Sequence, residues 1–409
     1  MRQGVGAAPD FAAVAVTGRP VPRPPRRLAT AEFFAGIGLA RMGLEAGGFS
    51  VVWANDIDAR KRAMYERHFG TTEATAVDPR DICDVSGSDL PAGLALAWAS
   101  FPCTDLSLAG WRDGLRGSQS GTVWEFFRVL REMDRSRPPV VVLENVVGLG
   151  NSMGGRDLLS IGGALNGLGY SVDALVLDAR RWVPQSRPRL FVVGAMQPPP
   201  DTPRVLDPLR PEWLRGFFSA PGVRSHRALL PDPPPLRREG LSSIVDRLPR
   251  SDPAWWSPSL VEAFVGSLSE VQRARLEELR RSPSPVWRTA YRRTRGGAAV
   301  WEARPEDLAG CLRTARGGSS RQAVLEVGVG HLRIRWMTPV EYARLMGAGG
   351  YILDGASDNQ ARTGFGDAVC VPAVEWLAAN YLMPLARRRA RRATREPFTR
   401  ERAAIGIAR

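Results

Sequence analysis

The chain has 409 residues, a formal net charge of +14 and 44% hydrophobic residues, enough to bury the core of one large domain and one smaller one. No apolar run reaches the roughly 18 residues that a membrane span requires, so we expect a cytoplasmic protein that does not bind membranes. Its four cysteines lie far apart with no CxxC pair and it has three histidines, which argues against a disulfide framework and a metal site.

Most of the positive charge lies near the two ends of the chain. Residues 1–27 contain five Arg and one Asp and finish in a Pro-Arg run, and residues 386–409 contain nine Arg and two Glu. Because proline fixes φ and removes a hydrogen-bond donor, we expect no regular structure in residues 1–27. Each basic tail is either a nonspecific nucleic-acid arm or a solvated end, and composition leaves both readings open.

Residues 28–195 alternate short apolar runs with helical patterns. A stripe of apolar residues between 123 and 133 predicts an amphipathic helix. Short apolar runs separated by helices predict an α/β domain with a mostly parallel, doubly wound sheet. The predicted strands lie within 28–34, 50–54, 94–101, 140–143, 172–177 and 190–193.

The composition changes after residue 195. Residues 196–335 are rich in Pro, Trp and Arg and predict a smaller, irregular second domain, whose tryptophans we expect to form a small core. Thr338 and Glu341 have the spacing of a capping box around Pro339 and predict a helix start. Residues 336–385, including an apolar helix over 368–382, are expected to return to the first domain before the basic tail of residues 386–409.

Three segments at predicted strand ends suit an adenosine-containing cofactor. Phe34, Gly36 and Gly38 form a glycine turn after the first strand. Asp56, about 20 residues further on, ends the second strand, where a carboxylate accepts hydrogen bonds from ribose hydroxyls. Asp81 follows in the Asp81-Ile82 pair, within reach of an adenine amino group.

Reactive side chains follow the other strands. Cys103 lies just beyond the run that ends at Phe101, where a nucleophile would reach the cofactor. Glu144 ends the strand 140–143, and Arg187 and Arg189 come just before the strand 190–193. A thiol with a carboxyl group and two guanidinium groups as partners would form a reactive set. The alternatives are a helix cap for Glu144 and a surface position for the Arg pair.

In this order, the motifs resemble those of the DNA (cytosine-5) methyltransferases over most of residues 29–383. The resemblance implies a Rossmann-like, S-adenosylmethionine-dependent methyltransferase domain in which residues 196–330 are the target recognition domain. It is carried by Phe34-x-Gly36-x-Gly38, Pro102-Cys103, Glu144-Asn145-Val146, Gln185-x-Arg187-x-Arg189, Arg335-x-x-Thr338-Pro339 and Gly366-Asp367-Ala368-Val369.

The resemblance also implies a role for each residue. Cys103 would add to C6 of cytosine and Glu144 would stabilise charge at N3. Arg187 would bind the base O2 or a phosphate, while Arg189 orients Glu144 or its loop. S-adenosylmethionine is expected at Phe34, Gly36, Gly38, Asp56, Ile57, Asp81, Ile82, Pro102 and Asp367.

The implied substrate is a cytosine flipped out of double-stranded DNA by a monomeric enzyme. A restriction-modification or anti-phage role is expected, with partner proteins of a defence system left open. A tRNA cytosine-5 methyltransferase and an inactive DNA-binding module are the alternatives, and the intact reactive set argues against the second. The loop residues expected to contact DNA, unless they form a plain surface loop, are Arg313, Arg316, Gly317, Gly318, Ser319, Ser320 and Arg321.

The chain departs from the family's pattern at four places. Thr104 stands where the family commonly has Gln, Leu106 where it commonly has Phe, and Ile57 where an aromatic residue often stacks on adenine. Asp367 replaces an Asn near the cofactor, whose own carboxylate it would repel. We expect Asp367 to turn away and cap a helix beginning at Ala368, the alternative being an ion pair with an Arg.

Overall fold

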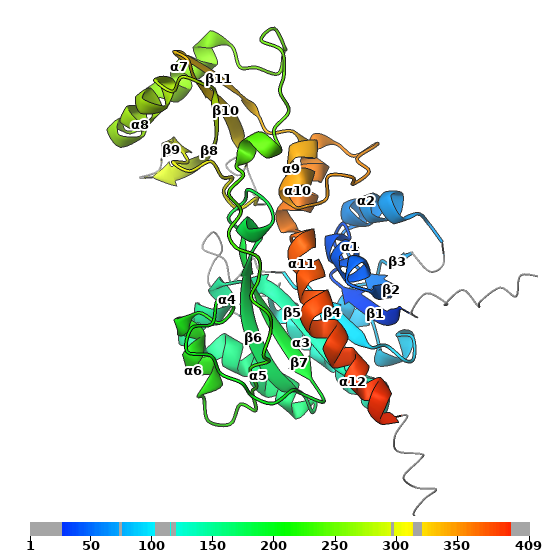
Figure 1. Ribbon diagram of the computed structural model, residues 1–409. Coiled ribbons are helices and arrows are strands. Elements are labelled where there is room, and N and C mark those ends of the chain that lie inside the picture. Colours follow the sequence, from blue (N-terminus) through cyan, green and yellow to red (C-terminus); the bar gives the residue numbers. More distant parts are fainter. Residues whose placement is uncertain are drawn as a thin grey trace, which may run out of the picture.

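The computed structural model describes residues 27–72, 76–102, 115, 120–295, 298–313 and 321–393. Cys103 and the loop residues Arg316 to Ser320 lie outside these residues, as do most of both tails. In the described part of the chain, seven strands form one sheet and four form another, with helices on each (Figure 1). This confirms the predicted α/β class.

The seven-stranded sheet has the order β3-β2-β1-β4-β5-β7-β6. Neighbours from β3 to β5 pair in parallel, whereas β7 is antiparallel to both β5 and β6. Each of the six predicted strands is present, and the short β3 was not predicted. The bounds are β1 Leu28–Phe33, β2 Phe49–Asn55, β3 Val77–Asp78, β4 Leu96–Ala99, β5 Val140–Val146, β6 Ser171–Asp178 and β7 Pro188–Ala195.

Both faces of this sheet are buried, which explains its continuous apolar strands. Successive residues of a strand point to opposite faces. Ala97 and Ala99 accordingly join the core cluster beneath α3 and α5, while Leu96 and Trp98 join the cluster beneath α1 and the C-terminal helices. The helices concerned are α1 Leu39–Ala46, α2 Ala59–Phe69, α3 Val123–Glu132, α4 Gly148–Asn151 and α5 Arg156–Gly167.

Part of the segment after residue 195 lies against the seven-stranded sheet. A bridge joins Val172 of β6 to Ser225, and the short α6 spans Arg215–Phe218. Arg210 binds the fully buried Asp173 of β6 through two hydrogen bonds of 2.9 and 2.6 Å. A domain boundary at residues 195 and 196 stays a prediction, and this stretch packs with β6.

The second sheet has the order β11-β10-β8-β9, and all its described pairs are antiparallel. The composition predicted an irregular region, but the chain forms a sheet whose β10 is buried at every position and packs into two core clusters. Of the expected core tryptophans Trp255, Trp256, Trp287 and Trp301, only Trp256 and Trp301 pack together, with Trp336 and Phe264. Trp287 and Trp255 join a neighbouring cluster. The elements are α7 Pro258–Gly266, α8 Glu270–Arg280, β8 Val286–Arg295, β9 Ala298–Ala303, β10 Ala323–Gly328 and β11 His331–Trp336.

The chain then returns to the first sheet (Figure 1). The predicted capping box is present, because Glu341 N donates to Thr338 Oγ1 and Thr338 N donates to Glu341 Oε2. α11 packs so closely on α1 that a Cβ at Gly43 would lie 2.6 Å from Val374. The returning elements are α9 Pro339–Leu345, α10 Asp358–Asp367, α11 Val371–Leu377, a π-helical turn Ala378–Leu382 and α12 Met383–Ala393.

The C-terminal helices are longer and more apolar than the sequence pattern indicated. A window within 358–388 has a mean hydropathy of 1.3 and passes a membrane-span test on length and composition, but 61% of it is buried in the fold. A core helix passes the same test. α12 also continues beyond residue 385, where the basic tail was predicted to begin.

Candidate active site

The glycine turn after β1 is held open beside β2. Phe34, Gly36 and Gly38 all have positive φ, of 55°, 59° and 81°, a conformation that costs glycine little. A Cβ on Gly36 would meet nothing within 4 Å, whereas one on Gly38 would lie 2.7 Å from Tyr65. Gly36 therefore borders open space where a ligand can approach the backbone, and Gly38 is required for packing on α2.

Asp56 fixes this turn as well as bordering it. Its Oδ2 accepts a hydrogen bond from Gly36 N at 2.7 Å, and its Oδ1 accepts one from Asp58 N at 2.8 Å. Burial raises the pKa of this carboxyl group. Each oxygen keeps a second lone pair, so hydrogen bonds from ribose hydroxyls still fit. The side chain of Ile57 next to it is 63% exposed and offers an apolar surface.

Asp81 and Ile82 lie at the same edge but differ in orientation. Asp81 caps a short 3-10 helix by accepting from Cys83 N at 2.9 Å. The side chain of Ile82 is buried in the core beneath α3, so only its backbone is placed to contact a ligand. An open backbone cradle flanked by Asp56 and an exposed Ile57 fits an adenosine-containing cofactor, and each residue's role stays a prediction.

Asp367 does not behave as the sequence suggested. It ends α10, and the next helix begins only at Val371, so it caps no helix there. Its Oδ2 instead accepts a hydrogen bond from Lys61 Nζ of α2 at 2.6 Å. The compensation we expected from helix capping, or from an Arg, comes from the single lysine of the chain.

Lys61 also lies close to the glycine turn. Burial opposes the charge of Lys61, but Asp367 and Asp56 outweigh it and raise the pKa of the ammonium group. The same return segment reaches the turn through Tyr351, whose hydroxyl donates to Ile37 O at 2.8 Å. The ammonium group of Lys61 therefore lies near two carboxylates, those of Asp367 and Asp56, where we expect the cofactor. The sequence analysis missed the pair of Lys61 and Asp367 because the two residues are 306 positions apart.

Glu144 and Arg189 form a buried ion pair, with Arg189 Nε 3.2 Å from Glu144 Oε1. The sheet register produces it, since Arg189 pairs with Val146 across β5 and β7 and Glu144 lies two residues away on the same face. The two side chains are 12% and 7% exposed. This arrangement agrees with the predicted orientation of Glu144 by Arg189.

Asn145 connects Glu144 to the strand that leads to Cys103. Its Nδ2 donates to Phe101 O at 3.0 Å, and its Oδ1 accepts from Val146 N at 2.8 Å. The turn at Phe101 and Pro102 is thus tied to β5. Cys103 itself lies outside the described residues, so its role as nucleophile stays a prediction.

Arg187 lies deeper than the sequence suggested and is 1% exposed. Its Nη1 donates to Leu312 O at 2.7 Å, and its Nη2 donates to Gly366 O at 2.8 Å and Ala368 O at 2.5 Å. These bonds join β7 to the second domain and to the segment around Asp367. The predicted contact of Arg187 with a base or phosphate stays untested.

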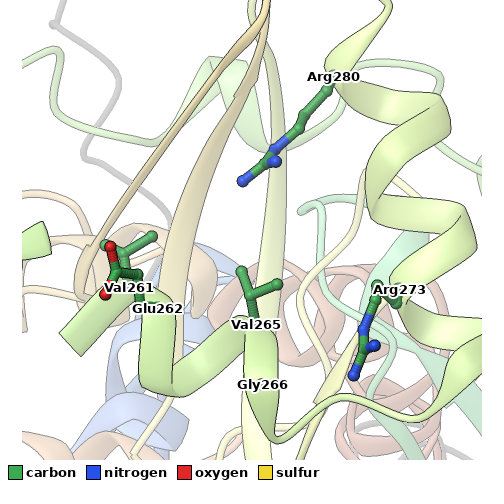
Figure 2. Close-up of a pocket in the computed structure, with 6 residues that line it drawn as sticks. All are labelled: Val261, Glu262, Val265, Gly266, Arg273 and Arg280. Atoms are coloured by element: carbon green, nitrogen blue, oxygen red, sulfur yellow. The ribbon is translucent and has the colours of Figure 1, made fainter. Parts of the chain in front are cut away.

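Two of the predicted DNA-contact residues are described. Arg313 is exposed, and Arg321 is half-buried with its guanidinium 4.4 Å from the centre of the Trp336 ring. Arg316, Gly317, Gly318, Ser319 and Ser320 lie outside the described residues. A cavity of about 480 Å³ lies between α7 and α8. Figure 2 shows the residues that line it, and none of them is a predicted site residue.

Residues 28–212 match the family described as C-5 cytosine-specific DNA methylase. Type II methyltransferase M.HaeII of Haemophilus aegyptius is 32% identical over 56% of this chain and 69% of its own length. The chain belongs to the C-5 cytosine-specific DNA methylase family. Its members are enzymes, and their fold implies a donor of the S-adenosylmethionine type.

Other similarities agree with membership of this family. Type II methyltransferase M.Bsp6I of Bacillus sp. (strain RFL6) is 35% identical over 41% of this chain, and the match spans about half, 52%, of that enzyme. The crystal structure of the S. pombe Dnmt2 methyltransferase superposes with a TM-score of 0.58 at 15% identity, covering 88% of this chain and 99% of that one. The latter similarity concerns the fold.

Proposed function

We propose that this chain transfers a methyl group from S-adenosylmethionine to C5 of a cytosine flipped out of duplex DNA. The observation that carries the proposal is the buried pair of Glu144 and Arg189 at the carboxyl edge of the sheet. A carboxyl group fixed in a dry site can select a cytosine by hydrogen bonds to N3 and the exocyclic amine. Its neighbour Asn145 ties this site to the strand end that precedes Cys103.

The chemistry requires a nucleophile because cytosine C5 is unreactive. Addition of the Cys103 thiolate to C6 forms an S–C6 bond and shifts an electron pair through the ring toward N3 and C5, where Glu144 stabilises the developing charge. S-adenosylmethionine supplies an electrophilic methyl group for C5. Loss of the C5 proton to a base then breaks the S–C6 bond, regenerates the thiolate and leaves 5-methylcytosine.

The cofactor would be held by the edge formed by the glycine turn, Asp56 and the backbone at Asp81. Gly36 offers an open backbone approach, and Ile57 an apolar surface beside it. Phe34, Gly38, Ile82, Pro102 and Asp367 complete the proposed cofactor-binding set. An open backbone approach and a carboxylate at a parallel-sheet edge suit an adenosine ligand.

The second sheet and its loops would supply DNA contacts. Arg313 and Arg321 flank the predicted recognition loop, and phosphate contacts by Arg give much of the binding energy in such complexes. We further propose a monomeric cytoplasmic enzyme of a restriction-modification or anti-phage system. The names of the relatives M.HaeII and M.Bsp6I, both Type II methyltransferases, support that context.

Covalent trapping tests the proposal. Duplex DNA containing 5-fluorocytosine should form a stable adduct with the wild type in the presence of the cofactor, because the fluorine at C5 cannot leave as a proton. Cys103→Ser should abolish the adduct and still bind cofactor, since an alkoxide is far harder to form than a thiolate. Cys370→Ala, which removes a buried thiol elsewhere, is the matched control and should still form it.

Methyl transfer to duplex DNA and to tRNA should be compared in parallel. Transfer to DNA alone supports the proposal, and transfer to tRNA alone would make the chain a tRNA methyltransferase. An adduct formed by Cys103→Ser would show that the nucleophile is a different residue. A wild type that methylates neither substrate would leave an inactive DNA-binding module.

A further inference from the structure

The sulfur of Cys311, in the predicted second domain, lies beside Arg187 and Arg189, the two arginines of the proposed catalytic site. Its Sγ is 3.2 Å from Arg187 Nη1 and 3.9 and 3.8 Å from Nη1 and Nη2 of Arg189. Arg189 is the residue that contacts Glu144. One guanidinium group therefore lies between the carboxyl group of Glu144 and the thiol of Cys311.

The backbone fixes Cys311 in this place. Ala309 N donates to Pro184 O at 2.8 Å, and Ser186 N donates to Ala309 O at 3.1 Å. Leu312 N, on the other side of Cys311, donates to the buried Gln185 side chain at 3.0 Å. The segment 309–312 is thus attached to the residues just before β7 on both sides of the sulfur.

The electrostatics favour a strong hydrogen-bond acceptor at this sulfur. Burial opposes ionisation of Cys311, but the charges of Arg187 and Arg189 outweigh it and lower the pKa of the thiol. A thiolate accepts from guanidinium groups more strongly than a thiol does. Arg189 has a hydrogen-bond acceptor on either side, the carboxyl group of Glu144 and the sulfur of Cys311, which limits the directions in which its guanidinium group can turn.

We propose that Cys311 is a positioning residue of the methyl transfer: its sulfur holds Arg189 against Glu144, so that the second domain completes the catalytic edge. The inference rests on the proposed function, and it assigns to the second domain a part in the rate of the reaction in addition to the choice of DNA. Residues that orient a reacting group cost about 10- to 100-fold in activity when removed.

Two substitutions of nearly equal shape distinguish the role of the Cys311 sulfur as a hydrogen-bond acceptor from its role in packing. Cys311→Thr retains a hydroxyl that accepts from a guanidinium group, whereas Cys311→Val has a methyl group in its place. We expect Cys311→Val to lower kcat at saturating DNA and cofactor about 10- to 100-fold, with DNA affinity changed less than about threefold. Cys311→Thr should recover most of the rate.

Cys370→Ala is the control for loss of a thiol, because it removes a buried thiol that packs on Ala179 and Val183. It should lower the midpoint of thermal unfolding and leave kcat near that of the wild type. If Cys311→Val keeps the wild-type kcat, or if the Thr and Val variants lose rate equally, the sulfur does not act as an acceptor and the inference is wrong. A loss confined to DNA affinity overturns it too.

The proposed function is tested by measurements that do not involve Cys311. Methyl transfer by the wild type and its loss in Glu144→Gln test that function without reference to Cys311. A wild type that does not methylate DNA would remove the proposed function and the inference together. An active wild type with a fully active Cys311→Val would remove only the inference.

Discussion

The ion pair of Lys61 and Asp367 predicts a specific pattern of cofactor affinity. Replacing Lys61 by Gln leaves the carboxylate of Asp367 without its cation, and a cofactor carboxylate at this edge would then be repelled. At the observed 2.6 Å separation, two unit charges attract by about 1.6 kcal/mol even in a medium with the dielectric constant of water.

The net value must be smaller, because the two side chains are 21% and 42% exposed. Solvent screening and loss of side-chain freedom reduce such pairs to about 1 kcal/mol or less. If the whole of this energy is felt by the cofactor, affinity falls about fivefold. We therefore expect Lys61→Gln to weaken S-adenosylmethionine binding by up to about fivefold.

Calorimetric titration of S-adenosylmethionine into four proteins tests this reasoning. Asp367→Asn should bind within a few-fold of the wild type, and the double variant Lys61→Gln, Asp367→Asn should recover the affinity lost in Lys61→Gln. This non-additivity is the signature of a direct pair. If the double variant binds as weakly as Lys61→Gln, or if Lys61→Gln binds normally, the carboxylate of Asp367 does not oppose the cofactor. A large loss in Asp367→Asn would make the carboxylate itself a ligand.

Glu144→Gln should lower kcat by about 100-fold or more with little change in DNA affinity, because the carboxyl group acts on charge that develops in the transition state; lost affinity with a normal rate at saturation would refute its role. Exchange of residues 247–330, within the predicted recognition domain 196–330, for those of a relative with another target should change the methylated site, since base readout requires groove contacts. An active chimera that keeps the original site would show that specificity lies elsewhere. Burial raises the pKa of Glu32 to about 8 from 4.5, so the folded protein retains a proton that the unfolded chain releases. The free energy of unfolding should therefore fall as pH rises from 5 to 8, by at most about 1.4 kcal/mol per pH unit from this group, and urea titrations should show a shallower fall for Glu32→Gln.

The sequence predicted the elements whose signals are local. Apolar runs buried on both faces located β1, β2 and β4 to β7, and the spacing of Thr338 and Glu341 located α9. The approach of Arg189 to Glu144 was expected only from the family resemblance. In a parallel sheet a residue that precedes one strand and a residue that follows another lie at opposite edges, and the two meet because β7 runs antiparallel to β5. The grouping of these reactive side chains thus depends mainly on topology.

Contacts between distant segments were not predictable in this way. Nothing near Lys61 indicates that it pairs with Asp367, and nothing near Cys311 indicates two guanidinium groups from β7. The expected helix cap at Asp367 was wrong because α10 extends through that residue before the chain turns. The second sheet was missed because β8 carries Arg at several positions, which weakens its apolar pattern.

The packing of α11 on α1 has a consequence for synthesis of the protein. Val374 fits against Gly43, and Tyr381 binds Asp173 of β6 at 2.8 Å, so the last helices complete a face that begins with β1 and α1. Contacts of such long sequence separation form late. A growing chain would thus leave the ribosome with its cofactor edge unfinished until the second domain has also emerged. Under the proposed function, a nascent fragment would therefore lack the complete site that methyl transfer requires.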